Sequence, residues 1–197
     1  MSLATRLLLS AQVTGGALAS PPLVFMTFNI LNCRNEGHPW AERKELVAGA
    51  MEFANADVVG VQEAYYEQME WLRERLPAYE CFGEGREGGR EGEYAGIFYR
   101  HARFSLLAGG NLWLSQAPTV AGRFADCWGE RQEVGPATCH GFEGPQRQGP
   151  RIDWILVRGP VSVLGAERVT WNRDGVWPSD HFPVVARVAL CASAEMD

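Results

Sequence analysis

Strand-like and helix-like apolar patterns alternate through the N-terminal part of the chain, and this order limits the fold more than any other feature. Residues 23–31 alternate apolar side chains as a half-buried strand does. Residues 40–55 carry an apolar stripe at helical spacing. A short apolar strand follows at 57–63, and a second helix ends before Pro77. The order strand–helix–strand–helix predicts packed α and β layers, which is an α/β fold.

The rest of the chain is predicted to be mainly strands. The apolar segments with this pattern are 79–83, 94–100, 104–107, 111–114, 152–157, 161–169 and 184–190. The segment 84–93 lacks the Gly-Lys-Ser/Thr ending of a phosphate-binding loop, so we expect a solvated connection. No internal repeat or linker interrupts the series, and residues 23–192 are therefore predicted to form one domain.

The charge balance favours a small or lipid-like partner over long nucleic acid. The chain has a net charge of −6, and Lys44 is its only lysine. A broad nucleic-acid-binding face needs clustered Lys and Arg, so long duplex DNA is disfavoured. The five cysteines are widely spaced and include no Cys-x-x-Cys pair. We therefore expect buried free thiols rather than disulfides or a zinc site. The sequence carries no signal for an oligomeric state.

Residues 1–22 differ from the sequence that follows and are interpreted as a leader. Arg6 precedes an apolar stretch, and Ala17-Leu18-Ala19 has the small-residue pattern of a cleavage site. Two interpretations stay open: a signal peptide for secretion or periplasmic export, and a cytoplasmic protein with a disordered leader or a misplaced start codon. Residues 193–197 are predicted to be a tail, and no apolar run is long enough to span a membrane.

Polar side chains stand at the ends of several predicted strands. Asp180 and His181 are adjacent in a proline-flanked turn directly before the strand 184–190, while Asn29 and Glu63 end earlier apolar strands. A carboxylate and an imidazole held together can bind a metal and stabilise charge on a phosphate. Taken singly, each residue has a plainer explanation, such as a capped turn or a strand-end carboxylate.

Four segments together resemble the signature segments of the endonuclease/exonuclease/phosphatase superfamily, in that family's order. They are Thr27-Phe28-Asn29-Ile30, Val61-Gln62-Glu63, Gly149-Pro150-Arg151-Ile152-Asp153-Trp154-Ile155 and Ser179-Asp180-His181-Phe182-Pro183. Supporting matches lie at 40–44, 92–99, 113–115 and 138–142. Ordered motifs are more specific than any one alone. The resemblance implies a four-layer sandwich of two β-sheets flanked by helices, with a Mg²⁺- or Mn²⁺-dependent site that hydrolyses phosphoesters.

The resemblance also implies a role for each matching residue. Glu63 would hold the metal through a carboxylate oxygen, Asn29 would bind it by its amide oxygen or through water, and Asp180 would assist there. His181 would donate to a phosphoryl oxygen, and Asp153 would accept from the other ring nitrogen and fix the tautomer.

Two further residues, His140 and Tyr94, are candidates for lining the substrate pocket. Structural roles fit both of them equally well.

Two central motifs of the family, a Thr-His-Leu-type strand and a Gly-Asp-Phe-Asn segment, do not occur in this chain. Residues 113–118 match the family before that block and residues 124–128 match it afterwards, so we interpret the junction at 119–123 as an internal deletion. In the family, the Asp of the absent segment positions or deprotonates the attacking water and its Asn holds the phosphate. Loss of the general base alone is expected to lower the rate by about 10²–10⁴-fold.

The deletion also bears on the fold, because the absent block supplies central strands and covering helices. Their loss should expose strand edges and apolar faces. Asp126 lies near the junction but fits the family's downstream segment, so we do not assign it as a replacement base.

Three interpretations of function follow. The chain is a metal-dependent phosphoesterase with reduced activity, a non-catalytic binding module, or the product of a truncated gene model. Genomic and transcript sequence across the codons for 120–124 separates the third from the others, because an uninterrupted reading frame in both removes it.

Overall fold

The structure is a computed structural model that describes residues 2–11, 21–114, 125–128, 135–149 and 151–191. The predicted deletion near 119–123 lies outside the described residues.

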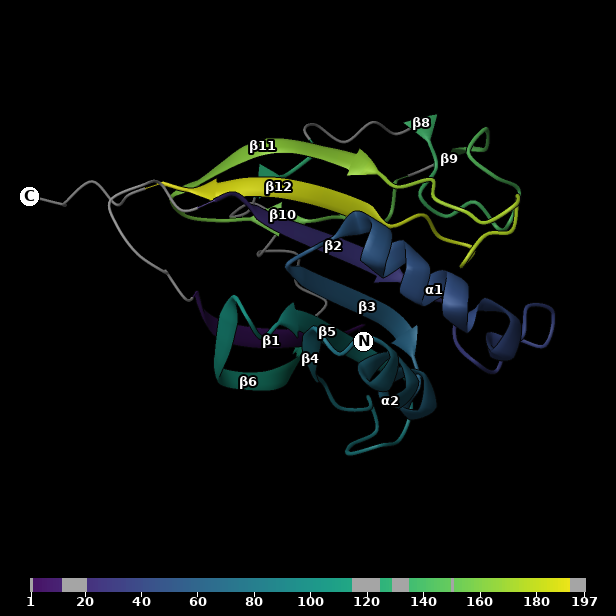
Figure 1. Cartoon of the computed structure of the whole chain (residues 1–197), viewed down its shortest axis with the longest axis horizontal. Coiled ribbons are helices and arrows are strands. Elements are labelled where there is room, and N and C mark those ends of the chain that lie inside the picture. Colours follow the sequence, from purple (N-terminus) through teal and green to yellow (C-terminus); the bar gives the residue numbers. More distant parts are fainter. Residues whose placement is uncertain (1, 12–20, 115–124, 129–134, 150, 192–197) are drawn as a thin grey trace, which may run out of the picture.

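A six-stranded mixed sheet forms the centre of the molecule (Figure 1). In spatial order its strands are β11 (Val161–Arg168), β12 (Val184–Leu190), β2 (Leu23–Asn29), β3 (Val58–Ala64), β5 (Tyr94–Arg100) and β4 (Tyr79–Phe82). β2 and β3 are parallel, whereas the other neighbours are antiparallel. Val184 at the start of β12 lies opposite Thr27 near the end of β2. The turn before β12 therefore meets the ends of β2 and β3 at one end of the sheet.

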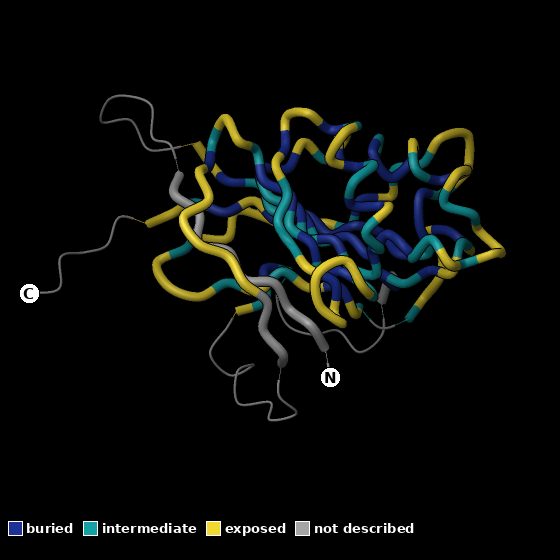
Figure 2. The backbone as a smooth tube through the Cα atoms, turned by 90° about the horizontal axis from the view of Figure 1, so that it is seen from below, coloured by how far each residue is buried: buried dark blue, intermediate teal, exposed yellow. Residues whose placement is uncertain are grey.

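Helices α1 (Trp40–Ala54) and α2 (Tyr66–Arg75) cover one face of this sheet. The apolar contacts between the strands and the helices involve Met26, Phe28, Val59, Val61, Val47, Ala50, Met51, Met69 and Leu72. Full burial of a large apolar side chain contributes about 1.5–3 kcal/mol, so this cluster is a main source of stability. α1 ends at Asn55, whose left-handed backbone caps the last turn. Figure 2 shows the buried strands in the middle of the molecule and the exposed loops around them.

The opposite face of the sheet packs against short strands from the C-terminal half. Its apolar cluster joins Phe25, Val58 and Tyr99 of the sheet to Cys127, Ile155 and Val157. In this layer β7 (Ala125–Asp126) pairs with β10 (Leu156–Val157). A further pair joins β8 (Gly135–Pro136) to β9 (Gln148–Gly149), so each of these four strands of the C-terminal half is two residues long.

One further antiparallel pair corrects a prediction. β1 (Ser2–Ala11) pairs along β6 (Phe104–Leu114), so the segments 104–107 and 111–114 are one strand rather than two. Gly109, within this strand, allows a close approach: a Cβ there would lie 2.7 Å from the Phe82 ring. β1 also shows that the segment interpreted as a leader contains a strand, while its cleavage stays a prediction.

The predicted strand 152–157 is likewise shorter than expected, because only Leu156 and Val157 are in a strand. The reason is a side chain that competes for the backbone: Thr138 Oγ1 accepts the N–H groups of Ile152 and Asp153. The α/β fold class is confirmed, with the helices and the strands of the central sheet within two residues of their predicted bounds. Neither described helix has the length and apolar character needed to cross a membrane.

Asp57 joins the start of β3 to its neighbours and provides a test of this packing. Its carboxylate is 5% exposed, pairs with Arg103 at 2.6 Å and accepts the N–H of Val24 at 2.8 Å. Asp57→Ala leaves both donors without their acceptor, so we expect the free energy of unfolding to fall by about 2–3 kcal/mol in urea denaturation. Glu67→Gln breaks an ion pair with Arg34 in which both side chains are more than half exposed, and it should cost less than about 1 kcal/mol. Equal losses in the two variants would contradict this account.

Candidate active site

Glu63 lies in a bulge at the end of β3. The register with β5 shifts between Val61 and Ala64, and Glu63 has a φ of +60°, a left-handed conformation that costs a non-glycine residue about 1–3 kcal/mol. In this position its carboxylate accepts from Asn29 Nδ2 at 2.8 Å and from Asn32 Nδ2 at 3.4 Å. Hydrogen bonds from these two amides thus hold Glu63 in its strained conformation and orient its carboxylate.

Asn29, at the end of β2, is 8% exposed and uses both ends of its amide. Its Nδ2 donates to Glu63, and its Oδ1 accepts the N–H of Leu31 at 3.0 Å. Because the amide nitrogen faces Glu63, Asn29 orients that carboxylate in this structure. Its own oxygen, predicted to contact the metal, is turned toward the backbone.

Ser179 connects this pair to the turn before β12. Its hydroxyl donates to the carbonyl oxygen of Asn29 at 2.7 Å and lies 3.1 Å from Asp180 Oδ1. Glu63, Asn29, Ser179 and Asp180 therefore form one continuous series of polar contacts. The two predicted metal-ligating carboxylates are brought to the same end of the sheet.

Asp153 and His181 form a buried pair on the other side of the turn. His181 Nδ1 lies 2.9 Å from Asp153 Oδ2, and the two residues are 8% and 9% exposed. Burial disfavours the imidazolium, but the hydrogen bond and charge of Asp153 outweigh it, with help from Asp180 and Glu63, and the pKa of His181 is raised. With Asp153 accepting at Nδ1, Nε2 is the ring nitrogen free to contact a substrate oxygen.

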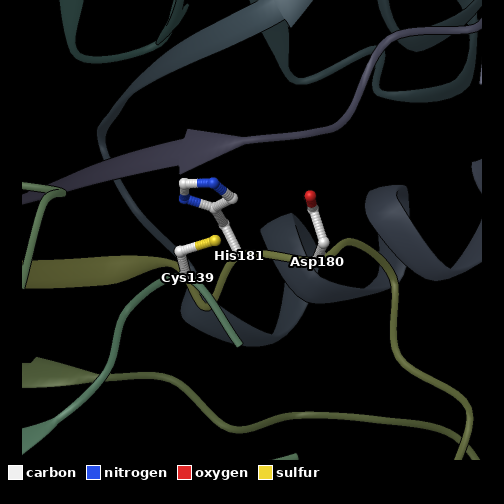
Figure 3. A group of neighbouring side chains, drawn as sticks. All are labelled: Cys139, Asp180 and His181. Atoms are coloured by element: carbon white, nitrogen blue, oxygen red, sulfur yellow. The ribbon is translucent and has the colours of Figure 1, made fainter. Parts of the chain in front are cut away.

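Cys139 stands next to this pair because residues 138–141 run alongside residues 180–182. Cys139 and His181 form an isolated antiparallel bridge, and the carbonyl oxygen of Asp180 accepts the N–H groups of His140 and Gly141. Figure 3 shows the Cys139 sulfur beside the His181 ring, with the Asp180 carboxylate projecting to the same side. Burial first, and then the charges of Asp180 and Asp153, raise the pKa of the Cys139 thiol.

The two predicted substrate-binding residues are both packed into the interior. The His140 ring is fully buried, stacks on Phe182 with the ring centroids 3.7 Å apart, and accepts the N–H of Gly144 at Nδ1. Burial lowers the pKa of His140 to about 4, so its ring is neutral. Tyr94 is 6% exposed and its hydroxyl donates to the carbonyl oxygen of Gly89 at 2.9 Å. Their contact with a substrate stays a prediction.

Asp126, which we did not assign as a base, forms an ion pair with an arginine. Arg151 donates to both of its carboxylate oxygens, at 3.2 and 2.5 Å, and both side chains are less than one-fifth exposed. This fork geometry binds the carboxylate as an ion-pair partner. Arg151 thus pairs with Asp126 rather than with Asp153.

Sequence reasoning missed the role of Arg43, whose side chain holds the loops of the site in place. The residue is 3% exposed and donates to the carbonyl oxygens of His38, Ile30, Leu31 and Pro178 at 2.8–3.1 Å. Burial lowers its pKa, against which the charge of Asp180 acts. Its place within the supporting match at 40–44 was the only signal, because an arginine on a helix is ordinarily solvated.

Removal of this guanidinium should destabilise the protein through the site. Arg43→Met removes four hydrogen bonds and leaves the carbonyl oxygens of His38, Ile30 and Pro178 without this donor, while that of Leu31 keeps Gln68 Nε2. We expect the free energy of unfolding to fall by about 3 kcal/mol or more, since bonds to charged groups contribute about 1.5–3 kcal/mol each. Arg43→Lys keeps the charge but loses the fork and should fall between Arg43→Met and the wild type. If denaturant unfolding gives Arg43→Met the same free energy of unfolding as the wild type, the loops are held by contacts other than those of Arg43.

Comparison with solved structures shows that the fold is shared with several proteins of low sequence identity. An endonuclease/exonuclease/phosphatase family protein from Bacteroides thetaiotaomicron is 18% identical with a TM-score of 0.76, over 91% of this chain and 99% of that chain. The mannosyl-6-phosphatase Bt3783 of the same organism is 19% identical with a TM-score of 0.72, over 85% and 99%. TDP2 from D. rerio, complexed with a single-strand DNA product, is 14% identical with a TM-score of 0.62, over 85% and 98%.

No curated protein matches the chain at a significant level. The model of the endonuclease/exonuclease/phosphatase family matches residues 26–133, which is more than half of the 197 residues and includes Asn29 and Glu63. This chain therefore belongs to the endonuclease/exonuclease/phosphatase family.

Proposed function

We propose that this protein hydrolyses phosphoesters with the help of a divalent cation, Mg²⁺ or Mn²⁺, at the end of the sheet that carries Glu63 and His181. The observation that carries the proposal is the buried pair of Asp153 Oδ2 and His181 Nδ1, 2.9 Å apart and next to Asp180. A carboxylate behind an imidazole fixes the tautomer and stabilises the protonated ring. The family and the fold neighbours support phosphoester hydrolysis as the type of reaction.

The donor set fits a small, hard cation. Glu63 and Asp180 offer carboxylate oxygens, which Mg²⁺ and Mn²⁺ prefer, and Mg²⁺ needs only one or two of them because it keeps waters and takes substrate oxygens. Asn29 would orient Glu63 for this role through the bond at 2.8 Å. The bound cation would offset negative charge on the phosphoryl oxygens.

His181 and Asp153 supply the protein's own share of the chemistry. Nε2 of His181 would donate a hydrogen bond to a phosphoryl oxygen and strengthen it as charge builds there. Its raised pKa favours the doubly protonated ring that this donation needs. Asp153 stays hydrogen-bonded at Nδ1 and keeps the ring oriented.

The attacking water has no assigned base in this chain. The Gly-Asp-Phe-Asn segment is absent from the sequence, and Asp126 is held by Arg151. We therefore expect turnover to be about 10²–10⁴-fold below that of an enzyme with a positioned base. This absence also favours the second candidate function, a binding module without catalysis.

The preferred substrate would be a small or lipid-like phosphoester. The net charge of −6 acts against a long polyanion. Among the fold neighbours, one is named a mannosyl-6-phosphatase and another holds a single-strand DNA product, so the shared chemistry is the phosphoester rather than one carrier.

Hydrolysis of p-nitrophenyl phosphate and bis(p-nitrophenyl) phosphate, with Mg²⁺ or with a chelator, tests the proposal. We expect slow cation-dependent turnover that falls about 100-fold or more in Glu63→Gln and in His181→Ala, because each removes charge stabilisation. Glu45→Gln, on the exposed face of α1 where it pairs with Arg75, should keep the wild-type rate.

Two results would contradict catalysis at this site. Equal rates in the wild type and in both site variants would assign the activity elsewhere. A folded, monodisperse wild type without any turnover would favour the binding module.

A further inference from the structure

Cys139 adds a soft ligand to two residues of the candidate active site. Among the described residues, one group of at least three metal-ligand side chains lies close together: the Cys139 sulfur, an Asp180 oxygen and a His181 ring nitrogen, all within 4.8 Å of one another. Figure 3 shows the three side chains on the same side of the two segments that carry them. We propose that Cys139, Asp180 and His181 bind a thiophilic divalent cation such as Zn²⁺, at a site that shares Asp180 with the proposed Mg²⁺ ligands but does not use Glu63.

The spacing suits a tetrahedral ion after a small adjustment. With metal–ligand bonds of about 2.0–2.3 Å, neighbouring ligand atoms in a tetrahedron stand about 3.3–3.8 Å apart. The observed limit of 4.8 Å is about 1 Å larger, which side-chain rotation of Cys139 and Asp180 can close. Three protein ligands leave the fourth position for water.

The surroundings of His181 provide the outer support that metal-bound histidines usually have. Asp153 accepts at Nδ1 at 2.9 Å, which directs Nε2 to the ion and completes a carboxylate–histidine–metal arrangement. The backbone supports the other two ligands: Cys139 bridges His181, and the Asp180 carbonyl oxygen accepts two N–H groups. The backbone of all three ligands and the ring of His181 are thus held by contacts that exist without an ion.

Charge and access also favour a cation. The carboxylates of Asp180 and Asp153 place negative charge near the Cys139 thiol, and Arg147 places positive charge there. Asp180 also interacts electrostatically with Arg43. Cys139 and Asp180 are partly exposed, so an ion from solution can reach them. On binding, the Cys139 thiol and the protonated Nε2 of His181 each give a proton to the solvent as the sulfur–metal and nitrogen–metal bonds form.

The site was hidden in the sequence because its ligands come from two distant segments. Cys139 has no partner cysteine at the spacing of a zinc finger. Its thiol lies near Asp180 and His181 only because residues 138–141 pair with residues 180–182.

A functional consequence rests on the proposed function. The thiophilic cation takes the Nε2 that would contact the phosphoryl oxygen, together with the carboxylate that would assist Mg²⁺. Zn²⁺ bound there would therefore stop phosphoester hydrolysis, and excess Mg²⁺ would displace it poorly because a thiolate prefers the softer ion.

Titration of the full chain with Cd²⁺, followed by the ultraviolet charge-transfer absorption of a cadmium–thiolate bond, reads this site without any turnover. We expect the wild type to develop the band with one equivalent of Cd²⁺ and to lose it when Zn²⁺ is added. Cys139→Ser should lack the band, and Asp153→Asn should bind about 10–100-fold more weakly, as loss of an outer-shell partner does. Cys191→Ser, at an exposed position after β12, should behave as the wild type.

The opposite pattern overturns the proposal: a band that persists in Cys139→Ser, or that disappears in Cys191→Ser, places the ion elsewhere. If Cys139→Ser does not fold, maleimide labelling of the wild type with peptide mapping decides instead. Zn²⁺ should protect Cys139, and equal labelling with and without Zn²⁺ would contradict the site. Cadmium binding without phosphoesterase activity would reject the proposed function and leave the metal site standing.

Discussion

The buried guanidinium of Arg43 reaches Pro178, 135 residues further along the chain, and the candidate site depends on that connection. It donates to Ile30 and Leu31 after β2 and to Pro178 before β12. A buried charge needs hydrogen bonds, so these carbonyl oxygens and Arg43 require one another. Asn29 and Ser179, one residue away from these carbonyls, make the contact that leads to Glu63 and Asp180. The position of the carboxylates therefore follows from helix α1 as much as from the strands.

The two sides of the site are built to different degrees. On the charge-stabilising side, His181 is fixed by Asp153, and the Asp153 backbone is fixed in turn by Thr138. For the attacking water, the acidic residue closest in sequence to the absent segment is Asp126, and its carboxylate forms a bidentate ion pair with Arg151. Electrostatic stabilisation can act without a positioned base, since it is often the largest single contribution to catalysis. The site is therefore suited to slow hydrolysis or to phosphate binding.

The sequence predicted the central sheet and its two helices well because their patterns are local. The apolar alternation of β2 and the helical stripe of α1 reflect one buried face each, which periodicity detects. Longer-range effects were not predictable. β6 continues through Gly109, where the absence of a side chain leaves room for the Phe82 ring. Residues 152–155 lie outside a strand, because Thr138 Oγ1 accepts the N–H groups of Ile152 and Asp153. Motif order grouped Glu63, Asp153, Asp180 and His181, and their roles stay a prediction, although Asp153 does lie 2.9 Å from His181. The inward packing of His140 was not visible in the sequence, because it depends on Phe182 and the fold around it.

Metal selectivity at this end of the sheet is set by which ligands Asp180 joins. With Glu63 it completes a set of oxygen donors, which suits Mg²⁺ or Mn²⁺. With Cys139 and His181 it completes a set of sulfur, nitrogen and oxygen donors, for which Zn²⁺ has the higher affinity. Because one carboxylate serves both sets, binding of either ion weakens binding of the other, and by linkage the two effects are equal. If both proposed sets of ligands bind their ions, the state of the site would follow the supply of the two metals. Cys139 would then couple the proposed phosphoester hydrolysis to zinc.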